Sequence, residues 1–288
     1  MKKVTRDDAG RKMSDAENRR LLLDILEYCA DICEKNNVRY FLSGGTLLGA
    51  IRHKGFIPWD DDIDVNVPRL DCEKLVKLIN EDKNNSCYEV YSIGNDPYAP
   101  ECRWFRIYDN RTVCEDTWGG RMKKPWYHPM FLDVFPVDGY PSTMEETLKF
   151  CKGMKFYANL MICWRNKGLN PENLLVCIRQ KIAFVVSRII GIKTIHKMCL
   201  KYVTKYDSET SEYVGVAAIT NYFPNESVKR VDYYKPVKVE FEGRMYNAPS
   251  NYETYLTQIY GNYMELPPIE KRNSGHQFVN YWKKGYDK

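Results

Sequence analysis

Hydrophobic positions in the first 140 residues follow two different spacings. A capping box at Ser14–Glu17 begins a run of hydrophobic residues at helical spacing that ends near Asn36, and residues 70–80 repeat that spacing. Other hydrophobic segments are short, are bounded by turn residues and predict strands: 38–42, 56–67, 88–93, 103–108, 111–115 and 131–135. Interleaved helices and strands of this kind predict an α+β catalytic core over residues 1–140.

From Ser142 onward the spacing becomes mainly helical. A second capping box at Ser142–Glu145 opens this part of the chain. The pattern predicts three helices, then a hairpin and a short helix: 142–167, 171–190, 193–206, 241–249 and 250–260. We therefore expect a mainly helical region over 141–240, facing the acceptor or a membrane, and a C-terminal segment over 241–288 that packs back on the core.

The segment from Leu174 to Lys201 combines hydrophobic residues with several Lys and Arg. This composition is typical of a basic amphipathic helix, which can lie on an anionic membrane surface. A bundle helix with an ordinary solvated face has the same composition and is the commoner case. Both interpretations stay open.

Four aspartates stand close together in the middle of the 56–67 segment. In an extended chain, Asp60, Asp62 and Asp64 share one face, while Ile63 and Val65 share the other. Neighbouring carboxylates repel one another and raise their own pKa values unless a cation lies among them. Oxygen ligands of this kind suit Mg²⁺ or Mn²⁺. The spacing therefore predicts a metal site, although a solvated loop or a Ca²⁺ site is the ordinary explanation of clustered aspartates.

A glycine turn precedes the aspartates. Gly44, Gly45 and Thr46 lie between a short strand and a short helix, where backbone N–H groups can cradle a phosphate. Arg52 and His53 follow and could offer further positive donors to that phosphate. Glycine pairs are usually plain turns, but this turn together with the carboxylates predicts metal-dependent phosphate transfer.

Two further charged residues lie in hydrophobic strands. Asp133 stands alone in the segment 131–135, and a buried carboxylate is costly without a cation or donors, so it is a candidate third metal ligand. Its alternative role is to cap a buried backbone group. Arg106 could face a nucleotide phosphate or lie at a solvated sheet edge. The dipeptides Asp109–Asn110 and Asp138–Gly139 predict turns.

These motifs resemble a known family. Gly-Gly-Thr followed by Asp-Ile-Asp-Val resembles the signature of the nucleotidyltransferase superfamily. The fuller string over residues 45–64 is similar to the LicD family, which includes bacterial phosphocholine transferases and is related to fukutin-type glycan phosphotransferases. Residues 131–138 resemble its second acidic strand, and residues 260–264 with Pro267, Pro268 and His276 resemble its C-terminal signature.

The resemblance implies a nucleotidyltransferase-like mixed sheet flanked by helices, with an appended helical region. It also implies Mg²⁺- or Mn²⁺-dependent transfer of a substituted phosphate, such as phosphocholine from CDP-choline. The acceptor would be a hydroxyl of a cell-surface glycan, in lipopolysaccharide or teichoic acid biosynthesis, or of its lipid-linked precursor. Asp62 and Asp64 would hold the metal, Asp133 would complete the site or accept the proton, and Gly44, Gly45 and Thr46 would orient the donor phosphates. Arg52, His53, Asp60, Arg106 and His276 are the remaining candidate substrate-binding residues, although a lone histidine is usually a surface residue.

Two other functions stay open. One is transfer of a whole nucleotide to a small molecule, which shares the glycine and aspartate motifs but releases pyrophosphate. The other is a non-catalytic, glycan-binding family member. Nucleic acid is not an expected partner, because no basic stripe interleaves with stacking aromatic residues.

Composition narrows the class of protein only a little. A chain of 288 residues with 44% hydrophobic and 28% charged residues is ordinary for a globular protein, and its net charge of +5 suits anionic partners. The ten cysteines lack CxxC spacing and predict free thiols in a reducing compartment. With no apparent signal segment and no apolar run of membrane-spanning length, we expect a cytoplasmic protein, free or peripheral at the inner face of the membrane.

Overall fold

A mixed β-sheet forms the centre of the computed structural model, which describes residues 3–117, 124–165, 174–276 and 278–286. Its main path runs β1–β11–β5–β6–β3–β2, and three short strands pair beside it. The β3–β6 pair is parallel and the other pairs are antiparallel. The strands are β1 (Ala9–Lys12), β2 (Phe41–Leu42), β3 (Asp64–Pro68), β4 (Tyr88–Val90), β5 (Phe105–Asp116), β6 (Trp126–Tyr140), β7 (Tyr213–Gly215), β8 (Val228–Lys229) and β11 (Val279–Lys283). The predicted α+β class is confirmed.

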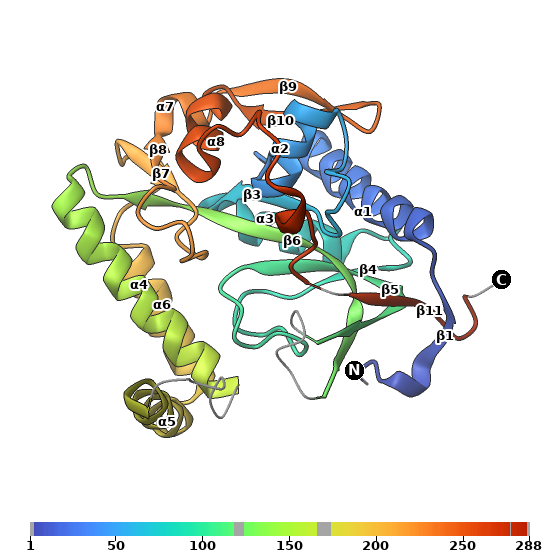
Figure 1. Ribbon diagram of the computed structural model, residues 1–288, viewed down its shortest axis with the longest axis horizontal. Coiled ribbons are helices and arrows are strands. Elements are labelled where there is room, and N and C mark those ends of the chain that lie inside the picture. The colour runs from blue at the N-terminus through green and yellow to red at the C-terminus, as the bar shows by residue number, and fades with distance from the viewer. Residues whose placement is uncertain (1–2, 118–123, 166–173, 277, 287–288) are drawn as a thin grey trace.

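Two long helices cover one face of this sheet (Figure 1). Helix α1 (Asp15–Lys35) begins at the predicted capping box, where Ser14 accepts a hydrogen bond from the backbone N–H of Glu17. Helix α3 (Arg69–Glu81) packs against α1, β3 and β6. The hydrophobic side chains between these helices and the strands form the main core.

Smaller elements close the end of the sheet next to β2 and β3 (Figure 1). They are α2 (Gly44–His53), α7 (Arg230–Tyr233), the hairpin β9 (Pro236–Phe241) and β10 (Arg244–Pro249), and α8 (Tyr252–Tyr260). The 3-10 helices η1 (Arg6–Asp8) and η2 (Ile269–Lys271) lie near the two ends of the chain. After η2 the chain returns to the sheet as β11, between β1 and β5.

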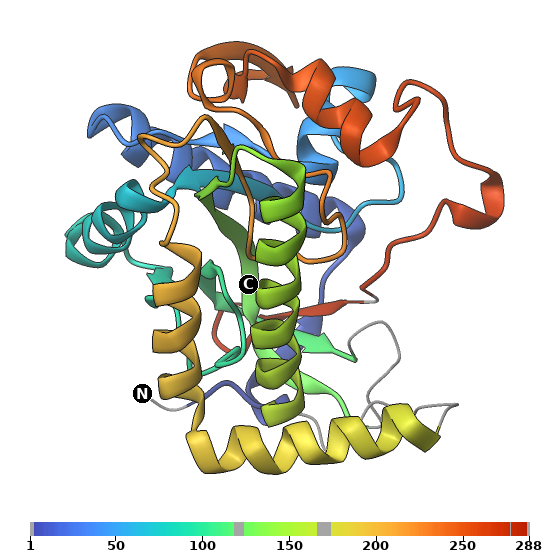
Figure 2. The same ribbon diagram turned by 90° about the vertical axis from the view of Figure 1, so that its left-hand side faces the viewer.

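Three helices form a separate layer beside the sheet. Helices α4 (Met144–Arg165) and α6 (Ile192–Val203) lie side by side around a second hydrophobic cluster, and α5 (Leu174–Ile190) crosses their ends (Figure 2). Positions 166–167 and 171–173 of the predicted helices lie outside the described residues. No helix among the described residues is long and apolar enough to cross a bilayer.

Four local predictions are wrong. The segment before Asp64 is not a strand, because β3 begins only at that residue. Asp109–Asn110 lies inside the continuous β5, as an irregularity in its pairing with β6. Asp138–Gly139 lies inside β6, where the carbonyl oxygens of Tyr206 and Asp207 approach too closely for a Cβ atom at Gly139. The second cap uses Thr143, whose hydroxyl accepts from the Glu146 N–H, one residue later than predicted.

Candidate active site

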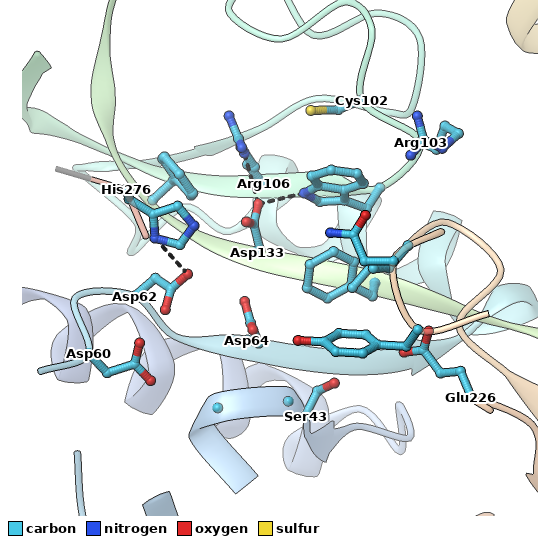
Figure 3. Close-up of a pocket in the computed structure, with 18 of the residues that line it drawn as sticks. Ser43, Asp60, Asp62, Asp64, Cys102, Arg103, Arg106, Asp133, Glu226 and His276 are labelled. Atoms are coloured by element: carbon cyan, nitrogen blue, oxygen red, sulfur yellow. Dashed lines mark hydrogen bonds and ion pairs between the residues drawn. The ribbon is translucent and has the colours of Figure 1, made fainter. Parts of the chain in front are cut away.

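Three of the clustered aspartates line a cavity of about 470 Å³ on the sheet face opposite α1 and α3 (Figure 3). Asp64 is the first residue of β3, and Asp60 and Asp62 precede it in an irregular segment. The predicted convergence of these three carboxylates therefore holds, although a loop rather than a strand produces it. Asp61 is not part of the lining and turns to other partners.

Strand pairing brings a fourth carboxylate to the same place. Asp64 and Asp133 are register partners in the parallel β3–β6 pair, and the N–H of Asp133 donates to the carbonyl of Ile63 at 3.1 Å. Along β6, Phe131, Asp133 and Phe135 line the cavity, while the alternate residues Leu132 and Val134 belong to the main core. Because side chains alternate along a strand, Asp133 points to the cavity wall although its neighbours in sequence are hydrophobic core residues.

Nearby cations offset the burial of the Asp62 and Asp64 carboxylates only in part: His276 acts at Asp62 and Arg106 at Asp64. Burial raises the pKa of Asp64 well above its usual range, and the charges of Asp62, Asp133 and Asp60 raise it further. Burial also raises the pKa of Asp62 well above its usual range, with His276 opposing the rise. The pKa of Asp60 is raised, again mainly by burial. A bound cation would relieve this electrostatic conflict.

Asp133 has its own donors. The Nε of Arg106 and the indole N–H of Trp104 both donate to the Oδ1 atom of Asp133, at 2.8 and 2.7 Å (Figure 3). The guanidinium of Arg106 also lies 3.9 Å from the ring centre of Phe131, and its Nη1 atom is buried without a hydrogen-bond partner among the described residues. Arg106 is therefore a buried cation in the cavity wall and not part of a solvated sheet edge.

His276 comes to the carboxylates from the C-terminal segment. Its Nδ1 atom lies 3.1 Å from Oδ1 of Asp61 and 3.4 Å from Oδ2 of Asp62, and its ring stacks on Phe278. Ser274 donates to the other oxygen of Asp61. Burial lowers the pKa of His276, but the hydrogen bond with Asp61 and the charge of Asp62 outweigh it, so that its pKa rises to about 9.

One compact group of ligand atoms is not the trio that the sequence indicated. Among the described residues, Asp61, Asp62 and His276 offer atoms that all lie within 4.8 Å of one another. This group shares Asp62 with the predicted set. Asp64 and Asp133 stand beside it across the parallel strand pair.

The two glycines make room for the carboxylates. Gly44 has a φ of +49°, and a Cβ atom there would lie 3.1 Å from Oδ2 of Asp64. A Cβ atom on Gly45 would lie 2.7 Å from Oδ2 of Asp60. Both glycines line the cavity at the N-terminal end of α2, whose free N–H groups favour an anion.

Comparison with known proteins agrees with this geometry. Residues 37–160 match the family described as LicD/FKTN/FKRP, nucleotidyltransferase domain. The chain is 31% identical over 273 residues to the lipopolysaccharide cholinephosphotransferase LicD of Haemophilus influenzae, an alignment that covers 92% of this chain and 97% of that protein. The chain belongs to the LicD family of phosphotransferase enzymes. The ribitol 5-phosphate transferase FKRP of Homo sapiens is 44% identical over 59 residues, which are 19% of this chain and 12% of that protein.

Three candidate residues of this LicD-family chain lie outside the cavity lining. Arg52 donates through Nη1 to the carbonyls of Tyr263 and Glu265, at 2.8 and 3.1 Å. His53 lies next to it, with its ring 6.4 Å from that of Trp59. The hydroxyl of Thr46 accepts from the N–H of Asp64 at 2.9 Å and thereby holds the start of β3. In this structure Arg52 and Thr46 hold backbone segments.

The structure also adds residues that sequence reasoning missed. The LicD-family cavity is walled by Glu226 and by aromatic side chains from separated segments: Trp104, Trp126, Phe131, Phe135, Tyr222, Tyr255, Tyr260 and Phe278. Tyr260 belongs to the C-terminal motif, and Phe131 and Phe135 belong to the motif at residues 131–138, so these two motifs were the available signals for part of this wall. Glu226 lies in a loop before β8 with no periodicity or motif around it.

Proposed function

We propose that this LicD-family enzyme transfers phosphocholine from CDP-choline to a hydroxyl of a cell-surface glycan or of its lipid-linked precursor. The observation that carries the proposal is the row of partly buried carboxylates of Asp60, Asp62 and Asp64 beside the glycine turn at the N-terminus of α2. The name of the Haemophilus relative, which aligns over nearly the whole chain, supports phosphocholine and lipopolysaccharide as the group and the acceptor.

The residues present fit a divalent cation. Burial and the neighbouring carboxylates raise the pKa values of Asp62 and Asp64 despite His276 and Arg106, and carboxylate oxygens are the ligands that Mg²⁺ and Mn²⁺ prefer. We assign Asp62 and Asp64 as ligands, with Asp133 as a third. Both donors of Asp133 reach the same oxygen, Oδ1, so that Oδ2 can serve a cation. The metal would neutralise charge on the diphosphate and on the leaving CMP.

The remaining groups hold the donor and move a proton. Backbone N–H groups at Gly44 and Gly45 would orient the donor phosphates, with Arg106 as a fixed positive charge. The acceptor oxygen forms a bond to the phosphorus of phosphocholine, the bond to the bridging oxygen breaks, and CMP leaves with the electron pair. Asp133 would either complete the metal site or accept the proton of the hydroxyl. The partly exposed Asp62 and His276 lie at the other end of the carboxylate row, where they would narrow the access of water to Asp64.

A donor assay tests this function. Purified protein is incubated with CDP-choline, CDP-glycerol and CDP-ribitol with and without Mg²⁺, and released nucleotide is followed by chromatography. We expect CMP from CDP-choline in the presence of Mg²⁺ and none with EDTA or in Asp62→Ala. Pyrophosphate from a nucleoside triphosphate would instead establish nucleotidyl transfer. If no donor reacts, even with lipopolysaccharide or teichoic acid as acceptor, the proposal is wrong.

A further inference from the structure

Glu226 is a buried acid that no step of the proposed reaction uses. The residue is 1% exposed and lines the cavity, and its Oε2 atom has no hydrogen-bond partner among the described residues. Burial raises the pKa of Glu226 well above its usual range. An uncompensated carboxyl in such surroundings is costly, so its presence requires an explanation.

The surroundings of Glu226 are aromatic. Tyr222 and Tyr260 line the same cavity, with ring centres 6.0 Å apart and planes inclined at 68°. Trp104, just before β5, and Phe135 of β6 form a second ring pair, with ring centres 5.1 Å apart. Figure 3 shows Glu226 on the opposite side of Asp64 from Asp60 and His276. The carboxyl therefore lies at the aromatic end of the cavity, with Asp64 between it and Asp60.

We propose that Glu226, Tyr222 and Tyr260 bind the quaternary ammonium head of the transferred group. Such a cation has no N–H to donate, so it is recognised by a negative charge and by the faces of aromatic rings. Its arrival would let Glu226 ionise and would offset the cost of burying that charge. This inference rests on the proposed function, because it specifies which phosphate ester the site selects.

Isosteric replacement tests the subsite. The values of kcat and KM are measured for CDP-choline and for neutral CDP-glycerol in the wild type, in Glu226→Gln and in Tyr222→Leu, with exposed Glu253→Gln as the matched control. We expect Glu226→Gln to lower kcat/KM for CDP-choline about 30-fold through KM, and to leave CDP-glycerol unchanged. An equal loss for both donors would make Glu226 a general structural or catalytic group, and no loss would also overturn the inference.

A binding measurement separates this inference from the proposed function. Titration calorimetry with tetramethylammonium chloride needs no turnover, so it reports on the subsite even if no donor reacts. Heat of binding in the wild type and in Glu253→Gln, but not in Glu226→Gln or Tyr222→Leu, is the expected result. Turnover of CDP-choline without any such binding would leave the function standing and exclude the subsite.

A second inference comes from α5. Of its residues, all of which the structure describes, only Ser187 is buried. Ile178, Ile182, Val185 and Ile189 recur at spacings of four and three, so they share one face of the helix. They are 45%, 58%, 54% and 79% exposed. The outward face is thus hydrophobic, which differs from the solvated face of an ordinary bundle helix.

Cations flank this outward face on both sides. Arg179 lies on one side of the stripe and Lys181 and Arg188 lie on the other, and α5 contains no acidic residue. Figure 2 shows α5 along the outer edge of the molecule, across the ends of α4 and α6. A second copy of the chain packed face to face would bring these cations together without counter-charges, whereas lipid headgroups supply them.

The geometry points to α5 as a helix that lies in the surface of an anionic bilayer. Its hydrophobic face would enter the boundary of the acyl chains, while Arg179, Lys181 and Arg188 would contact phosphate headgroups. The end of α4 at Ile162 and Arg165 lines the catalytic cavity, so this orientation holds the cavity near the membrane surface. A lipid-linked acceptor would then reach it by diffusion in the membrane.

Vesicle sedimentation tests this surface. Phosphatidylcholine vesicles with and without 30% phosphatidylglycerol, roughly the anionic content of a charged leaflet, are used for the wild type and three variants. We expect the double variant Ile182→Glu/Ile189→Glu to lose binding to vesicles. The triple variant Arg179→Gln/Lys181→Gln/Arg188→Gln should bind anionic vesicles about 100-fold more weakly. Exposed Leu70→Glu on α3 should bind normally. Failure of the wild type to sediment, or a change of oligomeric state in the α5 variants, would overturn the inference.

Discussion

Two aspartates on neighbouring strands, the buried Asp138 and the partly buried Asp64, have opposite electrostatic surroundings. Arg69 donates to both oxygens of Asp138, at 2.7 and 2.8 Å, and the pair is almost fully buried. Asp64 faces Asp62, Asp133 and Asp60, with Arg106 as the smaller opposing influence on its pKa. The fold therefore neutralises one carboxylate itself, and leaves the other for a cation that binds from outside.

The contrast separates structural charge from functional charge. A buried ion pair that satisfies its own hydrogen bonds contributes little net stability, but loss of one partner is severe. A cluster of like charges lowers stability until a ligand binds, and such conflicts concentrate at functional sites. Changes at Asp138 and Asp64 should thus affect different properties of the same protein.

The largest effect is expected from Asp64→Asn. Turnover of the donor should fall about 10⁴-fold, because the metal stabilises charge by several kcal/mol and each ~1.4 kcal/mol is a factor of ten in rate. The thermal midpoint in EDTA should rise, since the like-charge repulsion is relieved. Enzyme assays and calorimetry on the same preparation measure both, with exposed Asp232→Asn as the control. Wild-type turnover in Asp64→Asn would exclude this carboxylate from the metal site.

Arg69→Met should affect folding instead. It leaves Asp138 buried without a partner, and the free energy of unfolding should fall by about 3–5 kcal/mol. The folded fraction should keep its kcat, because Arg69 and Asp138 do not line the cavity. Urea denaturation measures the loss. The double variant Arg69→Met/Asp138→Leu should recover much of it, and a double variant as unstable as the single one would contradict the comparison.

The pH dependence of stability sharpens the same contrast. Acids with raised pKa values bind more protons in the folded state than in the unfolded state between the ordinary pKa of about 4 and the raised value. In EDTA, stability should therefore fall as pH rises through that window, by about 1–3 kcal/mol, and Mg²⁺ should restore it at neutral pH. Thermal melts at several pH values test this. A melting temperature independent of pH and Mg²⁺ would show that the ionised carboxylates do not destabilise the folded protein.

Local signals account for the elements that the sequence predicts well. The capping box at Ser14 predicts the first residue of α1 correctly, because the hydrogen bonds that begin a helix lie within four residues of the sequence. The hydrophobic run around Asp133 identifies a strand for the same reason. Asp109–Asn110 misleads, because pairing with β6 and β4 keeps β5 extended where the local sequence favours a turn.

The candidate site also contains residues that local sequence predicts and residues that only the fold brings together. Asp60, Asp62 and Asp64 are close in sequence, so their spacing alone indicates that they converge. Trp104 and Glu226 reach the cavity from two loops more than 100 residues apart, and only the folded chain shows that they line the same cavity. Arg52 looks like a phosphate ligand in the sequence, yet the C-terminal segment uses it to bind two carbonyls.

The smallest effect is expected from Trp104→Phe, which removes one donor from Asp133 and keeps an aromatic ring. Asp133 would retain Arg106 but lose the indole hydrogen bond of 2.7 Å. A hydrogen bond to a charged group is worth about 1.5–3 kcal/mol, so we expect about a tenfold fall in kcat with KM nearly unchanged. Stability should change little, because the ring still packs on Phe135. If kcat stays at the wild-type value, the orientation of Asp133 depends on Arg106 alone, as that of Asp138 depends on Arg69.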